Sequence, residues 1–356
     1  MSFYVKPGEG NPIVIEGLPF YEKEKLYRRL MLEPPEKLAD DVEGLTWQTA
    51  GVKFRFRART GSISVRAEVK EESRMHHMAA ISQSGFDCYV GKDGAEPEYS
   101  GTTVFGGPMD TEYERDVYRG PSDLIDVEIN CPLYNGLKSV EIGLDDGAEI
   151  LPPRPRTGGR ILLYGSSIEQ GGCSSRPGMC HSNILSRWLD SEVVNLGFSG
   201  AGRYERSSAL AVREVPRVTL FVMNGVGNCW SPEHVRENVP SFISLLREKY
   251  PETPILLFGM SKRTGERFGP EAEGSYELMS REVEKIASEL GGTDPHVYYT
   301  RLSHAFEVDG HSFEYEETVD GCHPTDLGFF LTSKHLYREI LRVRNEEDAK
   351  GKGCAK

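Results

Sequence analysis

The sequence predicts two domains: an all-β sandwich over residues 1–150 and a three-layer α/β/α domain with a parallel sheet over residues 161–345. Before residue 150, apolar and polar residues alternate in short runs, which is typical of strands with one buried face. After residue 160, continuous apolar strands alternate with helical patterns, which is typical of a parallel sheet covered on both faces. The length of 356 residues also favours two domains over one.

The first 150 residues contain short strand patterns and few helical ones. One short helix is expected near residues 21–29. Residues 52–58 and 63–69 alternate on either side of Thr60-Gly61, which predicts a β-hairpin with one solvated face. Further strands are predicted at 124–129 and 140–144, separated by glycine-rich turns. Many short strands joined by turns favour a sandwich.

The second half follows a linker at residues 151–160, whose sequence LPPRPRTGGR is rich in Pro and Gly. Strands are then predicted at 160–164, 193–196, 218–222, 255–258 and 297–299, and helices at 183–189, 233–250, 276–290 and 326–343. Residues 346–356 are charged and contain Gly, which predicts a flexible tail.

The composition narrows the class of partner. The net charge is −13, and an acidic protein repels phosphate backbones and anionic lipids, so we expect neither nucleic acid nor a membrane as a partner. The N-terminus lacks the pattern of a signal peptide, and no apolar stretch approaches the length of a membrane span. Seven irregularly spaced cysteines predict reduced thiols and a cytoplasmic protein.

Polar, glycine-flanked segments lie where the predicted strands end. They follow the first three strands of the second half, at 165–172, 195–202 and 224–228, and a fourth such segment, 320–326, precedes the last helix. Since functional sites of parallel sheets lie at the carboxyl ends of the strands, we expect these segments to converge on one edge.

The residues in these segments suit acyl transfer. Ser167 is the predicted nucleophile, because a serine at a strand-to-helix turn is exposed and faces a helix N-terminus. His323 is the predicted base that takes its proton, and Asp320 orients His323. The backbone N–H groups of Ser167 and Gly200 and the side-chain amide of Asn228 are predicted to hold the oxyanion. This chemistry needs no metal and no cofactor.

At these residues the sequence resembles the SGNH (GDSL-like) hydrolase family, whose four blocks occur here in order. They are Gly165-Ser-Ser167, Ser199-Gly200, Gly227-Asn228 and Asp320-Gly-Cys-His323. Ser166 replaces the usual Asp of the first block, and Val226 and Cys229 replace the Gly and Asp of the third. The resemblance implies a flavodoxin-like hydrolase domain and a serine esterase.

The first half also resembles a known partner of such domains. The stretch Gly85-Phe-Asp-Cys-Tyr89 is similar to the GxDLY motif of sandwich domains that precede some SGNH domains, with Cys88 in place of Leu. Residues 132–136, PLYNG, resemble a second stretch of the same domain. This resemblance implies a jelly-roll-like sandwich. It also implies a short-chain acyl substrate, favouring acetyl, on a sugar or oligosaccharide, because members of this kind are often sugar deacetylases.

Three other functions stay open: a lipid or phospholipid esterase with the same machinery, an acyltransferase, and a carbohydrate-binding protein with a vestigial site. Homo-oligomerisation also stays open. The absence of a long amphipathic or apolar lid disfavours the lipid esterase.

Single residues have simpler interpretations as well. A serine in the place of Ser167 is often just a helix cap, and Cys173 and Cys322 are interpreted as packing residues. Trp230 is a candidate wall of the substrate pocket. The residues His304, His311 and His323 with Asp309 and Glu314 match no compact ligand motif, so we predict no metal site there.

Overall fold

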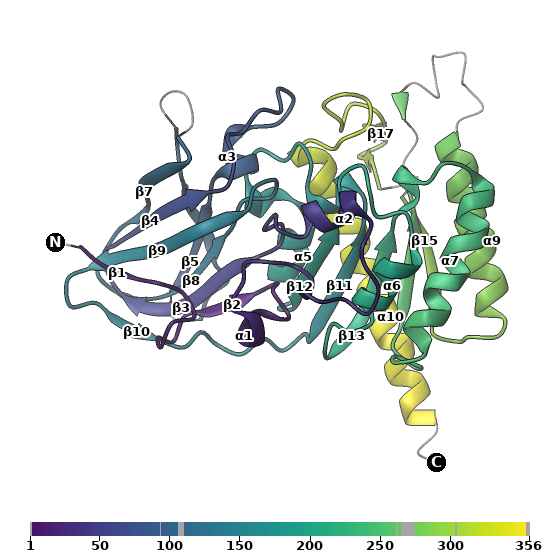
Figure 1. Cartoon of the computed structure of the whole chain (residues 1–356), viewed down its shortest axis with the longest axis horizontal. Helices are drawn as coiled ribbons and strands as arrows, with labels where there is room; N and C mark the ends of the chain where they lie inside the picture. Colours follow the sequence, from purple (N-terminus) through teal and green to yellow (C-terminus); the bar gives the residue numbers. More distant parts are fainter. Residues whose placement is uncertain are drawn as a thin grey trace.

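The first half of the chain forms an antiparallel β-sandwich in the computed structural model, which describes residues 2–92, 94–105, 110–260, 263–264, 275–302 and 305–353 (Figure 1). One sheet has the order β1-β9-β4-β7 and the other β10-β3-β8-β5-β6, with β2 paired to β3. The strands are β1 (Ser2–Val5), β2 (Val14–Glu16), β3 (Lys53–Arg59), β4 (Ser62–Val69), β5 (Asp87–Lys92), β6 (Glu98–Thr102), β7 (Glu112–Arg119), β8 (Leu124–Asn130), β9 (Leu137–Asp145) and β10 (Glu149–Leu151). The apolar faces of both sheets enclose one core.

The predicted hairpin around Thr60-Gly61 is wrong. The two alternating runs are β3 and β4, but they belong to different sheets: β3 pairs with β8, and β4 with β7 and β9. The Gly61 N–H donates to Asp145 Oδ2 at 2.6 Å, and this contact holds a corner at which the chain crosses the sandwich. Alternation therefore identified the buried faces, whereas the pairing depends on partners distant in the sequence.

The second half contains a five-stranded parallel sheet in the order β12-β11-β13-β14-β15. This 2-1-3-4-5 order is the flavodoxin-like order, so the predicted fold is confirmed. The strands are β11 (Arg160–Gly165), β12 (Glu192–Gly197), β13 (Val218–Asn224), β14 (Ile255–Gly259) and β15 (Val297–Arg301); a small separate pair is β16 (Glu307–Val308) with β17 (His311–Ser312).

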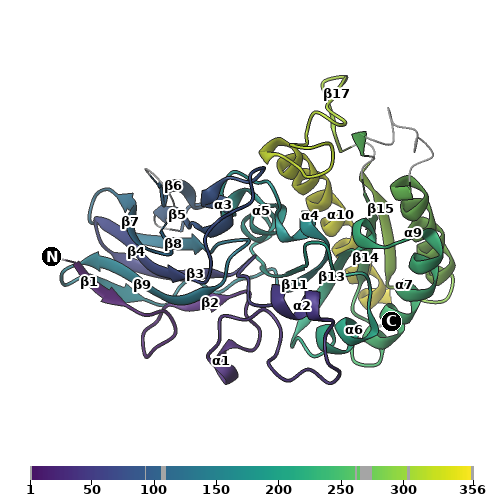
Figure 2. The same cartoon turned by 45° about the horizontal axis from the view of Figure 1, so that its top comes forward.

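Helices cover both faces of this sheet (Figure 2). Side chains on one face, including Leu162 and Phe221, pack with α6 (Arg206–Val212), α7 (Pro232–Arg247) and α9 (Ser275–Gly291). Side chains on the other face, including Leu163 and Val222, pack with α5 (His181–Trp188) and α10 (Asp326–Gly353). The shorter helices are α1 (Tyr21–Glu24), α2 (Asp40–Leu45), α3 (Ala80–Ser84), α4 (Ser167–Gln170), η1 (Pro177–Met179) and η2 (Val226–Asn228). Within the described ranges, no helix is both long and apolar enough to cross a membrane.

A segment of the first half completes the core of the second. Leu30, Leu38 and Val42 are at most 2% exposed and join the core beneath α6, α7 and α9. The fully buried Arg29 donates through Nη1 to the carbonyls of Asn195 and Gly197, at 3.0 and 2.7 Å. The chain around residues 29–42 thus packs as part of the α/β domain, although it precedes residue 150.

Two predicted ends differ from the structure. The first helix stops at Glu24, because Lys25 takes a left-handed backbone conformation with φ 55°. The predicted flexible tail is wrong over residues 346–353, which continue α10. Glu347 in this last part accepts from His296 Nδ1 at 2.7 Å, so the helix end is tied to the residue that precedes β15. Glu347 also accepts from Lys350 Nζ, one turn further along the helix, at 2.7 Å. Residues 354–356 lie outside the described part of the chain.

Candidate active site

Ser166 and Ser167 have different tasks at the turn between β11 and α4. Ser166 is the N-cap of α4: its Oγ accepts from the Ile168 N–H at 3.3 Å. Its own N–H and hydroxyl donate to Glu169 Oε2 at 2.7 and 2.8 Å, which completes a capping box. The serine that caps the helix is therefore Ser166. Ser167 is the first residue of the helix, and its hydroxyl is free for another partner.

The Ser167 hydroxyl lies at the head of a chain of hydrogen bonds. Its Oγ is 2.9 Å from His323 Nε2, and His323 Nδ1 is 2.8 Å from Asp320 Oδ2. Asp320 Oδ1 accepts from the backbone N–H groups of Cys322 and His323 at 3.0 and 2.8 Å. Partial burial opposes the ionised form of Asp320, but the bonds from His323 outweigh it and lower the pKa of this carboxyl. An ionised carboxylate only accepts, so His323 Nδ1 carries the proton and Nε2 is free to accept.

The backbone N–H groups of Ser167 and Gly200 are two of the predicted oxyanion donors. Gly200 has φ +69° and is exposed, and an added Cβ would meet no atom within 4 Å. Among the described residues, no hydrogen bond from the N–H of Ser167 or of Gly200 is found, so both donors are available to a ligand. Asn228 instead donates through Nδ2 to the carbonyls of Ala201 and, at 3.2 Å, Phe198. In this structure its amide braces the loop that carries Gly200.

The carboxyl group of Glu169 lies beneath the serine turn and is fully buried. Burial raises its pKa to about 7, although hydrogen bonds from Ser166 lower it in part. Asn224 Nδ2 donates to the other oxygen, Oε1, at 3.3 Å. The sequence reasoning did not single out Glu169, yet the S-x-x-E spacing of a capping box was the signal that could have found it.

The sandwich domain contributes directly to the site. The hydroxyl of Tyr134, in the stretch 132–136, donates to the Ser167 carbonyl at 3.0 Å. Asp87, the acid of the GxDLY-like motif, is buried and accepts from Arg176 Nη1 and the Gly178 N–H, both at 2.7 Å. Both sandwich motifs therefore contact Ser167 or the segment that follows it.

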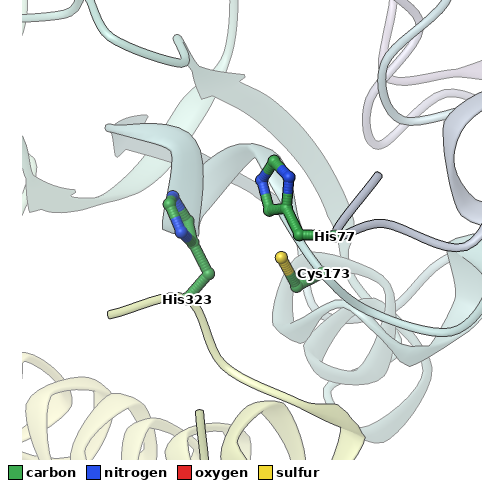
Figure 3. Close-up of side chains that lie close together, drawn as sticks. All are labelled: His77, Cys173 and His323. Carbon is green, nitrogen blue, oxygen red and sulfur yellow. The ribbon is translucent and has the colours of Figure 1, made fainter. Parts of the chain in front are cut away.

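His77 and Cys173 also lie beside His323 (Figure 3). The ring centroids of His77 and His323 are 5.8 Å apart, and Cys173 is 7% exposed. Burial raises the pKa of the Cys173 thiol to about 12, so it is a thiol rather than a thiolate at neutral pH. Of the histidines considered as metal ligands from the sequence, His304 lies outside the described residues, and His311 is exposed on β17.

Trp230, the candidate pocket wall, lies two residues after Asn228 and is 77% exposed. Its indole packs against the His234 ring at 4.6 Å between centroids, and the Arg203 guanidinium lies 5.6 Å from it. The side chain is held in place by these neighbours, yet it presents most of its surface to solvent.

The chain matches two family models along nearly its whole length. Residues 159–342 match the model described as the GDSL-like lipase/acylhydrolase family. Residues 3–150 match the model described as the GxDLY N-terminus of esterases of the SGNH hydrolase type. A comparison with curated protein sequences returns no match.

Solved structures share the whole two-domain arrangement. A protein described as a GDSL-like lipase from Bacteroides ovatus has a TM-score of 0.84 at 26% identity, over 97% of this chain and 98% of that one. A salicylyl-acyltransferase from a tetracycline biosynthetic pathway has a TM-score of 0.72 at 17% identity, over 96% and 97%. A family two carbohydrate esterase from Cellvibrio japonicus has a TM-score of 0.60 at 13% identity, over 97% and 98%. At such low identity the last two show a common fold.

Proposed function

The chain belongs to the GDSL-like lipase/acylhydrolase family, and from this premise we propose that it is a serine esterase that removes short acyl groups, acetyl above all, from carbohydrates. The observation that carries the proposal is the continuous chain from Ser167 Oγ through His323 to Asp320, with separations of 2.9 and 2.8 Å. A nucleophile, a base and a group that orients the base are the set that acyl transfer requires.

In the proposed mechanism, Ser167 Oγ attacks the ester carbonyl while His323 Nε2 takes the hydroxyl proton. Asp320 keeps the Nδ1 proton in place and stabilises the imidazolium that forms. When the tetrahedral intermediate collapses, His323 gives its proton to the departing alcohol and an acyl-enzyme remains. Water then attacks the acyl carbon with His323 again as base, which releases the acid and restores Ser167.

The oxyanion is held by the N–H groups of Ser167 and Gly200. Asn228 supplies a third donor by giving up its longer bond, the 3.2 Å contact to the Phe198 carbonyl. Each such donor typically contributes about 10²–10³-fold to kcat, because it is aimed at charge that develops only in the transition state.

Several features support a neutral sugar ester as substrate. The net charge of −13 disfavours anionic ligands. The exposed indole of Trp230, two residues after Asn228 in the chain, offers an apolar platform of the kind that binding sites use to orient a ring. Family two carbohydrate esterases share the fold, and one from Clostridium thermocellum has been solved in complex with cellohexaose.

The first test is hydrolysis of p-nitrophenyl esters from acetyl to octanoyl by wild type, Ser167→Ala and Ser175→Ala. Ser175 bonds to Asp326 and not to His323, so its variant is a matched control. We expect the highest turnover with acetyl, a loss of roughly a thousandfold or more in Ser167→Ala, and little change in the control. A fluorophosphonate should also label Ser167, as seen by peptide mass spectrometry. Folded wild type that hydrolyses none of these esters refutes the esterase proposal and leaves a carbohydrate-binding protein.

The substrate class is decided by a second series. Release of acetate from acetylated oligosaccharides supports the proposal, whereas activity that rises with acyl length indicates a lipid or phospholipid esterase. An acyltransferase is a second candidate, because the acyltransferase neighbour aligns over 96% of this chain. Addition of a free sugar should then divert the acyl group to that sugar faster than water takes it.

We also propose that the protein works in a reducing compartment, as expected for the cytoplasm. Six described cysteines are free and five of them are buried, so they are compatible with thiols that pack rather than cross-link. Titration of thiols in freshly purified, unfolded protein tests this: all seven cysteines of the sequence should react without prior reduction.

A further inference from the structure

Three metal-binding side chains meet beside Ser167. One nitrogen or sulfur atom from each of His77, Cys173 and His323 lies within 4.8 Å of the other two. They come from three separate segments: the turn before α3, the turn after α4 and the loop before α10 (Figure 3). Among the residues with described positions, no other group of three or more His, Cys, Asp or Glu side chains meets this spacing.

The hydrogen bonding of His323 suits a metal ligand. Because Nδ1 is 2.8 Å from the Asp320 carboxylate, the free lone pair lies on Nε2. A carboxylate on the far nitrogen of the imidazole is the arrangement that most metal-ligating histidines use, since it fixes the ring and makes Nε2 a better donor. A metal ion would compete for the Nε2 lone pair with the Ser167 hydroxyl, whose Oγ lies 2.9 Å from Nε2.

The position of Cys173 also suits a ligand. Its backbone has φ 74°, in the left-handed region that L side chains adopt reluctantly, and it directly follows Gly171-Gly172. From the sequence we interpreted this thiol as a packing residue, but its sulfur lies within 4.8 Å of a ring nitrogen of both His77 and His323, and the proposed hydrolysis does not use it. His77 is exposed to solvent, so packing in a core does not oppose rotation of its side chain toward the pair.

We propose that His77, Cys173 and His323 form a Zn²⁺ site, with water as the fourth ligand, and that the bound ion switches off the esterase. Zinc prefers nitrogen and sulfur donors in a tetrahedron, and sites with three protein ligands keep one position open. Ligands about 2.0–2.3 Å from the ion lie about 3.5 Å from one another. The three atoms are now at most 4.8 Å apart, so binding needs a closure of at most about 1.3 Å. Copper(II) would compete for the same donors.

Inhibition follows from which atoms the ion occupies. The ion takes the lone pair of His323 Nε2, and the proton of the Cys173 thiol passes to solvent as the sulfur binds. Ser167 then has no base. This part rests on the proposed function, because it requires His323 to be the base; the metal site itself does not.

The test uses the full-length protein freed of metal with a chelator, and Co²⁺ as a spectroscopic probe in place of Zn²⁺. A cysteine thiolate bound to Co²⁺ gives a sulfur-to-metal charge-transfer band in the near ultraviolet, and a tetrahedral site gives strong visible bands. The variants are Cys173→Ala, His77→Ala and Ser167→Ala, with His76→Ala as a matched control, because His76 adjoins His77 but is not in the group.

We expect both sets of bands in wild type, His76→Ala and Ser167→Ala, and their removal by Zn²⁺. Cys173→Ala should lose the charge-transfer band, and His77→Ala should need at least tenfold more metal. Zn²⁺ should inhibit ester hydrolysis reversibly, with at least tenfold weaker inhibition of His77→Ala, which keeps its basal activity. The proposal fails if wild type gives no charge-transfer band, if Cys173→Ala keeps it, or if His77→Ala and His76→Ala bind alike. If no ester is hydrolysed, the Co²⁺ spectra of Ser167→Ala still decide on the site.

Discussion

Asp320→Asn changes one atom of the hydrogen-bonded chain, and the surrounding donors determine how the new amide lies. Asp320 Oδ1 accepts two backbone N–H groups, at 3.0 and 2.8 Å. An amide nitrogen cannot replace that oxygen, because donors would then face donors. The amide oxygen therefore occupies the Oδ1 position and the NH₂ group faces His323 Nδ1. Nδ1 must now accept, so the imidazole proton moves to Nε2.

The consequence for catalysis is large, because an Nε2–H imidazole cannot take the proton of Ser167. Substitutions of this kind lower kcat by about 10⁴-fold in serine proteases with the same arrangement of groups. We expect a loss of roughly 10³–10⁴-fold here, which corresponds to about 4 to 5.5 kcal/mol of transition-state stabilisation. KM for p-nitrophenyl acetate should change little, since the carboxyl group lies behind the imidazole.

The assay is kcat and KM for p-nitrophenyl acetate, with the melting temperature of each variant measured alongside. Asp326→Asn is the control: its carboxylate accepts from the N–H of Ser175 at 2.8 Å and from the Ser175 hydroxyl, and it does not touch His323. It should keep kcat within tenfold. A folded Asp320→Asn variant that loses less than tenfold in kcat would refute the tautomer argument and the role proposed for Asp320.

Three further substitutions test the environment of Ser167. Ser166→Ala removes the N-cap of α4, so the unfolding free energy should fall by about 1 kcal/mol while kcat falls less than tenfold. Loss of all turnover in a folded variant would instead make Ser166 the nucleophile. In wild type, Glu169 has a folded pKa of about 7 against 4.5 unfolded, so its burial costs stability as pH rises through this window. As pH rises from 4.5 to 7, the unfolding free energy of Glu169→Gln should increase relative to that of wild type by about 3 kcal/mol. If urea denaturation gives the two proteins the same dependence of unfolding free energy on pH across that range, the raised pKa is contradicted. Tyr134→Phe removes one donor to the Ser167 carbonyl, which still accepts from the N–H groups of Gly171 and Gly172 at 3.2 and 2.9 Å. We expect the unfolding free energy to fall by about 1 kcal/mol and kcat/KM to stay within tenfold of wild type. A hundredfold loss of kcat/KM would instead give Tyr134 a direct role in catalysis.

The elements that the sequence predicts well are those specified by local pattern. The strands of the parallel sheet are apolar on both faces, so β11, β13 and β14 could be located within a residue or two. Ser167 follows from the rule that the site lies at the carboxyl ends of the strands, and Asp320 and His323 from the polar segment before the last helix. The structure brings the three side chains together.

The features that escape prediction depend on contacts distant in the sequence. β3 and β4 pair with other strands instead of with each other, and the corner between them is held by a hydrogen bond from Gly61 to Asp145, 84 residues later. The sequence reasoning identified Asn228 as an oxyanion donor, but its present partners, the carbonyls of Phe198 and Ala201, belong to another loop. Charge and glycine in residues 346–356 predicted a frayed tail, whereas residues 346–353 continue α10 and Glu347 makes a partly buried contact to His296, just before β15.

Removal of residues 1–150 should abolish the fold of the second half, although the linker suggests a clean division. Leu30, Leu38 and Val42 each bury a whole side chain in its core, which contributes about 1.5–3 kcal/mol apiece. Their sum, about 5–9 kcal/mol, is of the order of the whole unfolding free energy of a domain, about 5–15 kcal/mol. The carbonyls of Asn195 and Gly197 also lose the guanidinium of Arg29. We therefore expect residues 151–356 alone to lack a cooperative melting transition and esterase activity, and expect both to return when residues 1–150 are supplied as a separate co-expressed chain. A cooperative transition and wild-type turnover from residues 151–356 alone would show that the segment around residues 29–42 merely covers a core that is stable without it.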